Sequence, residues 1–199
     1  MYNTITKQSE NYKMLIKKKK LEGIFEINLE PHEDQRGFFM RTYDSKIFRN
    51  HGLKHEWVQE SHSYSKKKGI IRGLHFQFPP YAETKLIRAV TGEIFIVVLD
   101  LRKGSSTFGK WDSMIISKEN KKMLYVPKGF ALGMCTLTDN CTLLYKIDNY
   151  YAPENQGAIK WNDFDIGIKW PVKNPIISER DSKAISFKKF VEKYGGLEV

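Results

Sequence analysis

Several polar side chains fall within segments that have the residue pattern of β-strands, where a hydrophobic core would favour apolar ones. A histidine, a lysine and a tyrosine facing one cavity would supply a base, a cation for a developing oxyanion and an acid. This set can remove a proton beside a carbonyl group and return it elsewhere. Each residue also has an ordinary structural interpretation, as a hydrogen-bonded histidine, a lysine that extends to solvent or a tyrosine that covers the core. The candidates are Arg72, His75, Lys85, Arg88, Tyr145 and Lys146.

The segment around His75 reads GIIRGLHFQFPP, in which apolar and polar residues roughly alternate. Such alternation, with many β-branched and aromatic residues, is typical of a half-buried strand. Regular alternation places Ile71, Gly73 and Gln77 on the same face as His75. The face that holds His75 is therefore either part of a core or the wall of a ligand site.

The rest of the chain supplies many short strands separated by turn residues and no long helical pattern. This arrangement predicts an all-β fold, an antiparallel sandwich or barrel, and a barrel of this size has room for one small ligand. The predicted strands cover residues 23–31, 36–43, 56–65, 70–78, 85–90, 93–101, 111–117, 121–127, 130–137 and 141–148.

Two short helices complete the predicted elements. Residues 43–52 form a candidate helix capped by Asp44 or Ser45 and stopped by Gly52. Residues 182–196 form a candidate C-terminal helix. We expect residues 1–20 to be a loose basic arm and residues 21–199 to be a single domain. The apolar residues by which the C-terminal helix packs on the domain are Ile185, Phe187, Phe190 and Val191.

The composition excludes several classes of protein. At 199 residues and 41% hydrophobic content, the chain is long enough for one folded domain and has no apolar run that spans a membrane. Its start lacks the features of a signal peptide, and two isolated cysteines, Cys135 and Cys141, suit the reducing cytoplasm. The net charge of +10 comes with no nucleic-acid-binding motif. A small anionic substrate or solubility explains that charge as well, and the run Lys17–Lys20 is expected to be solvated.

A series of segments resembles the dTDP-4-dehydrorhamnose 3,5-epimerase family over roughly residues 22 to 190. They include HEDQRGFFMRTYD, WVQESHSYS, GIIRGLHFQ, KLIRAVTGEIF, LLYKIDNYYAPENQGAIKWND and ISERD, in this order. The resemblance implies a cupin-type jelly roll, normally a homodimer with strands exchanged across the interface. It also implies a substrate that is a nucleotide-linked 4-keto-6-deoxyhexose and a reaction that uses no cofactor.

The resemblance assigns a role to each of the central residues. His75 matches the catalytic base, and Asp181 matches the carboxylate that orients it. Tyr145 matches the acid that donates a proton to the opposite face of the enolate. Lys85 matches the cation near the C4 oxygen, and Arg72 belongs to the same site.

A second group of matching residues is implied to hold the nucleotide. Asp34, Arg36, Phe39 and Gln59 correspond to positions that contact it, some of them across the dimer interface. Tyr151 lies where the family often places a residue against the diphosphate or the sugar.

The chain departs from the family pattern at four positions. Leu132 replaces a histidine and Ile96 replaces an aspartate; if the two positions face each other, an apolar contact has replaced an ion pair. Leu132 also stands where metal-binding cupins carry a ligand, so we expect no metal. Arg41 replaces an acidic residue and Ser61 an asparagine near the nucleotide base. A donor in place of an acceptor predicts that CDP competes at least as well as dTDP, if Arg41 reaches the base.

Three alternatives remain beside a 3,5-epimerase. Loss of the histidine at Leu132 is compatible with epimerisation at C3 or C5 alone, on a CDP-linked or another sugar. A 3,4-ketoisomerase needs a pair of histidines in the pocket, and Leu132 argues against it. A non-catalytic sugar-binding jelly roll has no need of a base, an orienting carboxylate and an acid.

Overall fold

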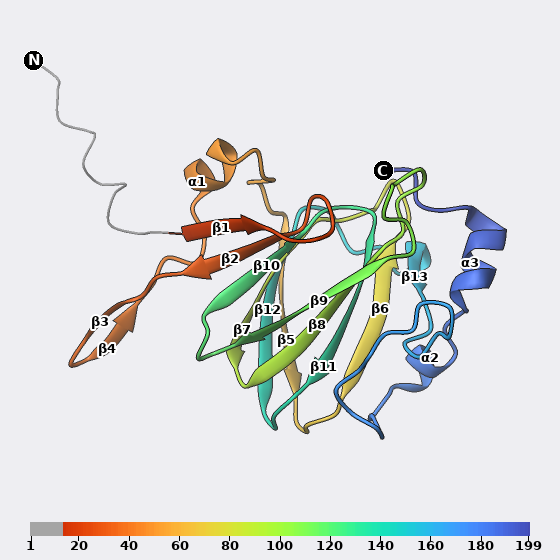
Figure 1. Cartoon of the computed structure of the whole chain (residues 1–199). Helices are drawn as coiled ribbons and strands as arrows, with labels where there is room; N and C mark the ends of the chain where they lie inside the picture. The colour runs from red at the N-terminus through yellow and green to blue at the C-terminus, as the bar shows by residue number, and fades with distance from the viewer. Residues whose placement is uncertain (1–13) are drawn as a thin grey trace, which may run out of the picture.

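The computed structural model describes residues 14–199, which form two antiparallel sheets packed face to face (Figure 1). The six-stranded sheet has the order β1 (Met14–Lys18), β2 (Phe25–Leu29), β10 (Lys122–Val126), β7 (Lys85–Thr91), β12 (Cys141–Ile147), β5 (Gln59–Ser65). The five-stranded sheet has the order β13 (Gln156–Ala158), β6 (Ile71–Gln77), β11 (Phe130–Thr136), β8 (Glu93–Asp100), β9 (Trp111–Ser117).

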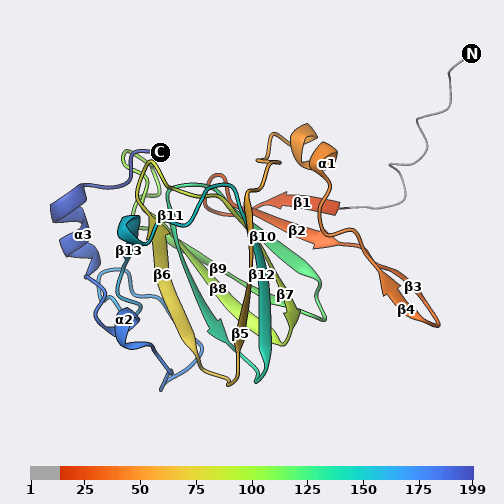
Figure 2. The ribbon, with the colours of Figure 1, turned by 180° about the vertical axis from the view of Figure 1, so that it is seen from behind.

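Smaller elements surround this sandwich. The hairpin of β3 (His32–Asp34) and β4 (Gly37–Phe39) projects away from the body of the protein (Figure 1). Helix α1 (Ser45–Asn50) lies near β1 and β2, while α2 (Glu179–Ser182) and α3 (Phe187–Tyr194) lie on the β6 side (Figure 2). A 3-10 helix, Pro153–Asn155, precedes β13.

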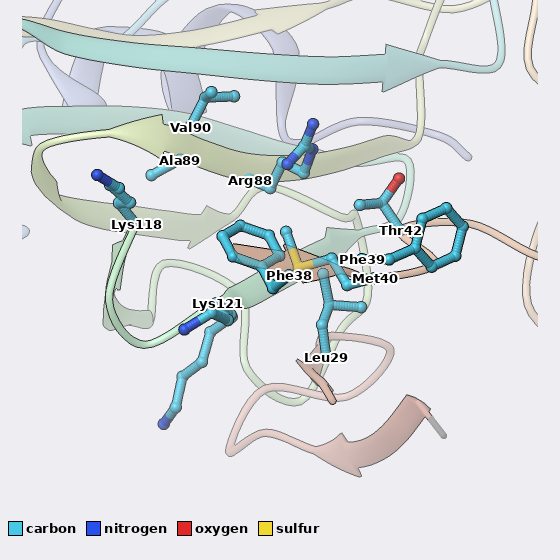
Figure 3. Close-up of a pocket in the computed structure, with 11 residues that line it drawn as sticks. Leu29, Phe38, Phe39, Met40, Thr42, Arg88, Ala89, Val90, Lys118 and Lys121 are labelled. Carbon is cyan, nitrogen blue, oxygen red and sulfur yellow. The ribbon is translucent and has the colours of Figure 1, made fainter. Parts of the chain in front are cut away.

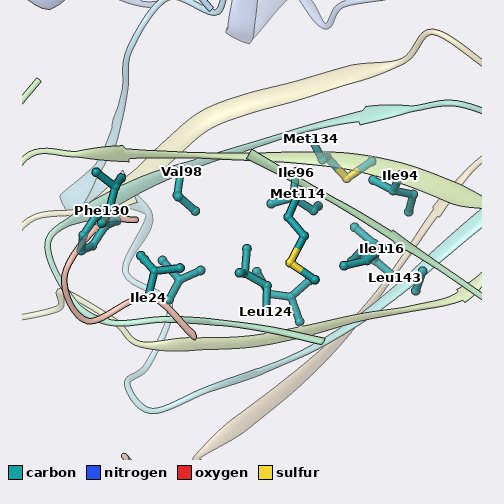
Figure 4. Close-up of a cluster of buried hydrophobic side chains, with 14 of the residues drawn as sticks. Ile24, Ile94, Ile96, Val98, Met114, Ile116, Leu124, Phe130, Met134 and Leu143 are labelled. Carbon is teal, nitrogen blue, oxygen red and sulfur yellow. The ribbon is translucent and has the colours of Figure 1, made fainter. Parts of the chain in front are cut away.

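The main core lies between the two sheets, and alternation along β8 explains how it forms. Ile94, Ile96 and Val98 point inward into this core (Figure 4). Val97 and Leu99 point outward and pack with Phe190 of α3 in a second buried cluster. Because β8 is covered on both faces, it is apolar from Ile94 to Leu99, as expected for a central strand.

The prediction of an antiparallel all-β fold is confirmed, although some predicted boundaries are wrong. The predicted strand 36–43 is only the three residues Gly37–Phe39, and β1, β3 and β13 were not predicted. Strand β1 falls within the predicted loose arm, so Met14–Lys18 belong to the sheet, while residues 1–13 lie outside the described part. The run Lys17–Lys20 does not precede the first strand as predicted, because Lys17 and Lys18 are in β1. Lys17, Lys18 and Lys20 are exposed as expected, whereas Lys19 is partly buried and lies 3.5 Å from Asp112.

Both predicted helices are present. Asp44 caps α1 by accepting hydrogen bonds from the Lys46 and Ile47 amides. Helix α3 begins after its N-cap Ser186 and ends at Gly195 in the left-handed conformation. Its Phe190 is buried as predicted, but Ile185 precedes the helix and pairs with Ile159 in a β-bridge instead.

A buried carboxylate organises the loop after β8. Asp100 is fully buried and accepts hydrogen bonds from the Arg102 guanidinium at 3.0 and 2.7 Å. It also accepts from the hydroxyls of Ser105 and Thr107 at 2.7 and 2.6 Å. Burial alone would raise the pKa of Asp100, but these donors hold the pKa below its ordinary value. The ionised carboxylate thus fixes the loop that follows the central strand.

Candidate active site

A cavity of about 460 Å³ opens between the two sheets and brings most of the predicted catalytic residues together. Arg72 and His75 line it from β6, on the five-stranded sheet. Lys85 of β7 and Tyr145 of β12 line it from the six-stranded sheet. Figure 2 shows β6 and β12 in these two separate layers. A ligand in the cavity therefore meets His75 on one side and Tyr145 on the other.

An irregularity in β6 decides which of its residues face the cavity. His75 pairs with Leu132 of β11 and Arg72 pairs with Met134, so three steps along β6 match two along β11. One extra residue in β6 forms a bulge, which puts Arg72 and His75 on one face. The predicted regular alternation is wrong here, since neither Ile71, Gly73 nor Gln77 lines the cavity with His75.

Gly73 makes this close pairing possible. Its φ of +122° favours glycine, and an added Cβ would lie 2.6 Å from both the Gly133 Cα and the Leu132 carbonyl oxygen. The backbone of β6 therefore approaches β11 more closely than any side chain at position 73 would allow.

His75 is held by a buried carboxylate from outside the sheet. Its Nε2 lies 2.6 Å from Asp181 Oδ1, and the other Asp181 oxygen accepts the Gly73 amide at 3.2 Å. Asp181 is 3% exposed and sits in α2, whose N-cap Ser178 accepts the Asp181 amide. Burial raises the pKa of Asp181, but the hydrogen bonds from His75 and Gly73 outweigh it and keep this pKa below its ordinary value. The Nδ1 atom of His75 is left as the ring nitrogen for a ligand.

The opposite wall contains one residue that the sequence analysis missed. The Lys85 ammonium lies 2.7 Å from a carboxylate oxygen of Glu83, and both side chains are nearly buried. Glu83 and Lys85 are two residues apart, which is the spacing of side chains on one face of an extended chain. That spacing was available from the sequence. Gln59 and Ser61 of β5 complete this wall beside Tyr145.

The mouth of the cavity carries further polar groups. The Tyr151 hydroxyl donates to Gln156 Oε1 at 2.9 Å, and its amide donates to Gln59 Oε1 at 2.9 Å. The Arg180 guanidinium also donates to Gln156 Oε1. Gln156 and Arg180 were not among the predicted residues, although Arg180 directly precedes Asp181.

Leu132 and its surroundings make one part of the cavity apolar. Leu132 packs against the buried core cluster that contains Ile96, which is fully buried. Leu132 and Ile96 do not face each other across the strands, because Leu132 pairs with Val98 and Ile96 pairs with Met134, but both belong to one apolar region. Met134 and Leu143 continue this lining.

Four predicted nucleotide-binding residues, Asp34, Arg36, Phe39 and Arg41, lie away from this cavity in the same chain. Arg36 and Phe39 are on the projecting β3–β4 hairpin, where Arg36 is paired with Asp34 at 2.6 Å. Arg41 lies 3.2 Å from Asp44 at the start of α1. Phe39 contributes instead to a second cavity of about 370 Å³ (Figure 3). Within one chain, Arg41 therefore does not line the pocket in which it was expected to meet the base.

The described residues include no group of three histidine, cysteine or acidic side chains arranged to hold a metal ion. Within residues 14–199, no helix is long and apolar enough to cross a membrane.

Comparisons with known proteins show the family to which the chain belongs. The sequence model of the dTDP-4-dehydrorhamnose 3,5-epimerase family matches residues 18–189. A dTDP-4-dehydrorhamnose 3,5-epimerase of Shigella flexneri is 48% identical over 160 residues, covering 80% of this chain and 86% of that protein.

Two solved structures share the fold. The dTDP-6-deoxy-D-glucose-3,5-epimerase of Legionella pneumophila, in complex with dTDP-4-keto-L-rhamnose, has a TM-score of 0.87 and 32% identity, covering 94% of this chain and 99% of that one. A 3'-monoepimerase of Streptomyces bikiniensis in complex with dTDP-quinovose has a TM-score of 0.84 and 30% identity, covering 90% and 91%. The fold is thus the cupin-type jelly roll that the sequence predicted, and the chain belongs to the dTDP-4-dehydrorhamnose 3,5-epimerase family.

Proposed function

We propose that this protein is an epimerase that inverts carbon centres beside the C4 ketone of a nucleotide-linked 4-keto-6-deoxyhexose, without a cofactor. One observation carries the proposal: His75, which is paired with Asp181, lines one wall of the cavity, and Tyr145 and Lys85 line the opposite wall. Inversion requires a base and an acid on opposite faces of the sugar ring, and this arrangement provides both.

The reaction follows from the geometry. His75 Nδ1 accepts the proton from the carbon next to the ketone, and Asp181 stabilises the imidazolium that forms. The electron pair moves onto the C4 oxygen, where the Lys85 ammonium stabilises the enolate charge. Tyr145 then donates its phenolic proton to the same carbon from the other face. Exchange of protons with water returns His75 and Tyr145 to their starting states.

We assign the diphosphate to the basic mouth of the cavity. Arg72 lines the cavity, and the Arg180 guanidinium donates to Gln156 Oε1, which also accepts the Tyr151 hydroxyl. Guanidinium groups recognise phosphate well because they present several donors in a fixed plane.

We propose dTDP as the nucleotide. The similar structures from Legionella pneumophila and Streptomyces bikiniensis are complexes with dTDP-linked sugars. The argument for CDP depends on contact between Arg41 and the base, and in its own chain Arg41 lies beside Asp44 and outside the cavity. Calorimetric titration of the protein with dTDP and CDP tests this choice. Tighter binding of CDP than of dTDP would contradict it and would support a contact between Arg41 and the base.

We propose further that the protein is a cytoplasmic homodimer in which the β3–β4 hairpin reaches the partner's cavity. Phe38 and Phe39 on this hairpin are 51% and 59% exposed, which is unusual for two adjacent aromatic side chains. Arg36 on the same hairpin would then contact the nucleotide bound by the partner. The two buried free cysteines, Cys135 and Cys141, are compatible with a reducing compartment.

Complementation between two inactive variants tests the shared site. Arg36→Ala and His75→Ala homodimers should both be nearly inactive if the hairpin serves the partner's cavity. Coexpression of the two variants should restore roughly a quarter of the parent activity, because half of the dimers are mixed and each has one intact site. Absence of any recovery in a sample shown by sedimentation to be dimeric would place Arg36 in its own chain's site or outside the chemistry.

Epimerisation at a single carbon is the second candidate. A 3'-monoepimerase has the same fold, and Leu132 and Met134 make one part of this cavity apolar. His75 is the one histidine among the described residues that line the cavity, which argues against a ketoisomerase that needs a pair.

Deuterium incorporation from heavy water distinguishes these functions. With dTDP-4-keto-6-deoxyglucose as substrate, a 3,5-epimerase labels two carbons and a monoepimerase labels one. A sugar-binding protein labels none, and that result would overturn the proposed function. The same assay with the CDP-linked sugar tests the nucleotide under catalytic conditions.

A further inference from the structure

Glu83 links the cation of the cavity to the loop at its mouth. One oxygen of Glu83 lies 2.7 Å from Lys85 Nζ, and the other accepts Gln77 Nε2 at 3.0 Å. The Glu83 and Lys85 side chains are 9% and 11% exposed, so water provides few alternative partners. Both carboxylate oxygens therefore have a defined protein donor.

The surroundings of Gln77 fix the direction of these hydrogen bonds. Gln77 is buried, and its Oε1 accepts the Ala152 amide at 2.7 Å. Its Nε2 faces two backbone carbonyls, of Tyr81 at 2.8 Å and Tyr150 at 3.1 Å. A carbonyl can only accept and an amide N–H can only donate, so Gln77 must present its NH₂ group to Glu83. The two hydrogens of this group are shared among Glu83 and the two carbonyls.

Glu83 thus lies between two groups that only donate, the Gln77 NH₂ and the Lys85 ammonium. A carboxylate accepts on both sides, whereas an amide can accept from Lys85 only by turning its NH₂ group toward Gln77. Lysine has a long and flexible side chain, so its charged end needs a partner to stay in one place.

We propose that Glu83 is a positioning residue that holds the Lys85 ammonium where enolate charge develops, and that Gln77 orients Glu83. The inference rests on the proposed function, because Lys85 acts there on the enolate. It assigns Glu83 no contact with the reacting atoms.

Three substitutions separate position from charge. Glu83→Met keeps the length and removes both acceptors; we expect the rate of deuterium exchange at saturating substrate to fall about tenfold or more. Glu83→Asp keeps the charge but shortens the side chain by one methylene group, and we expect the exchange rate to fall in this variant too. Glu83→Gln keeps one acceptor within reach of Lys85, and the rate should stay within about threefold of the parent. The KM should change little in each case.

The control is Glu26→Met, which removes the carboxylate of another lysine pair, with Lys122 at 2.9 Å, in the same sheet but outside the cavity. It should exchange deuterium at the parent rate. Thermal unfolding of each variant shows whether it is folded. If Glu83→Met does not fold, Glu83→Asp still tests the proposal.

The outcomes distinguish two kinds of failure. Absence of exchange in the parent protein would remove the proposed function itself. Exchange in the parent together with parent rates in Glu83→Asp and Glu83→Met would overturn the positioning role alone. A Glu83→Gln variant as slow as Glu83→Met would also overturn it, because it would show that charge and not an acceptor within reach is required.

Discussion

Replacing Asp181 by asparagine changes one atom of the candidate dyad and leaves its shape intact. Both oxygens of Asp181 are used: Oδ1 lies 2.6 Å from His75 Nε2, and Oδ2 accepts the Gly73 amide at 3.2 Å. Asparagine has a single acceptor oxygen, so one of these two contacts must meet an NH₂ group. The expected effect depends on which contact the amide keeps.

The structure favours the orientation that damages the base. The Gly73 N–H is fixed in the backbone and can only donate, whereas His75 can move its proton to the other ring nitrogen. The asparagine oxygen therefore faces Gly73, its NH₂ faces His75 Nε2, and the ring proton moves to Nδ1 in the cavity. A histidine protonated on the working nitrogen cannot act as a base. The corresponding substitution in serine proteases, which also gives the wrong tautomer, costs about 10⁴-fold in kcat.

The opposite orientation of the asparagine amide sets the lower limit of the loss in rate. If the asparagine oxygen stayed on His75, the tautomer would be correct and only a charge-assisted hydrogen bond would be weakened, which costs about 1.5–3 kcal/mol or roughly 10- to 100-fold. We therefore expect Asp181→Asn to reduce the rate of deuterium exchange by about 10³- to 10⁴-fold, with little change in nucleotide affinity.

The assay measures deuterium exchange and dTDP binding for the parent, Asp181→Asn and the exposed control Asp165→Asn. Far-ultraviolet circular dichroism and thermal unfolding establish that the variants are folded. A rate for Asp181→Asn within threefold of the parent would refute the reasoning, because it would show that neither tautomer nor charge at His75 is controlled by Asp181.

Three other substitutions test separate parts of the account. Tyr145→Phe should keep proton loss to solvent but slow the formation of inverted product by about 100-fold or more; inversion at the parent rate, measured by NMR of the product, would remove its role as the acid. Gly73→Ala should lower the free energy of unfolding by several kcal/mol, about 3 or more, because its Cβ would clash with the β11 backbone; unchanged stability in urea would contradict the close approach. Asp100→Asn should cost about 1.5–3 kcal/mol at pH 7, because it removes the charge that strengthens the hydrogen bonds from the partly buried Arg102, while the exchange rate per folded molecule is unchanged. The pKa of Asp100 is lowered in the folded protein, so its stabilisation is present above the ordinary aspartate pKa and is lost as pH falls through the folded pKa. The difference in the free energy of unfolding between the parent and Asp100→Asn should therefore narrow in acid. A difference that stays constant in urea unfolding from pH 7 to pH 3 would contradict this prediction.

Alternation and turn residues were sufficient to predict most of the sandwich, because each central strand buries at least one regular face. Strand β1 was missed because the lysines beside Ile16 resemble a solvated segment, and its pairing with β2 depends on contacts far along the chain. The bulge in β6 could not be predicted from the sequence either, because Arg72 and His75 face the cavity together only through the register of β6 with β11.

The candidate site was predicted unevenly for similar reasons. The resemblance supplied His75 and Asp181, which are 106 residues apart and meet only through the fold. It did not supply Glu83, whose role depends on contacts with Gln77 and Lys85 that follow from no motif. Arg36 and Phe39 correspond to family positions, but whether they reach a nucleotide depends on a partner chain.

The central claim is that His75 removes the proton, and its most direct test is deuterium exchange by His75→Ala. In heavy water, with dTDP-4-keto-6-deoxyglucose, the parent protein should introduce deuterium beside the ketone. The folded His75→Ala variant should introduce none at any carbon while still binding dTDP. Retention of even a few per cent of the parent exchange rate by this variant would contradict the account, because another group would then have to be the base.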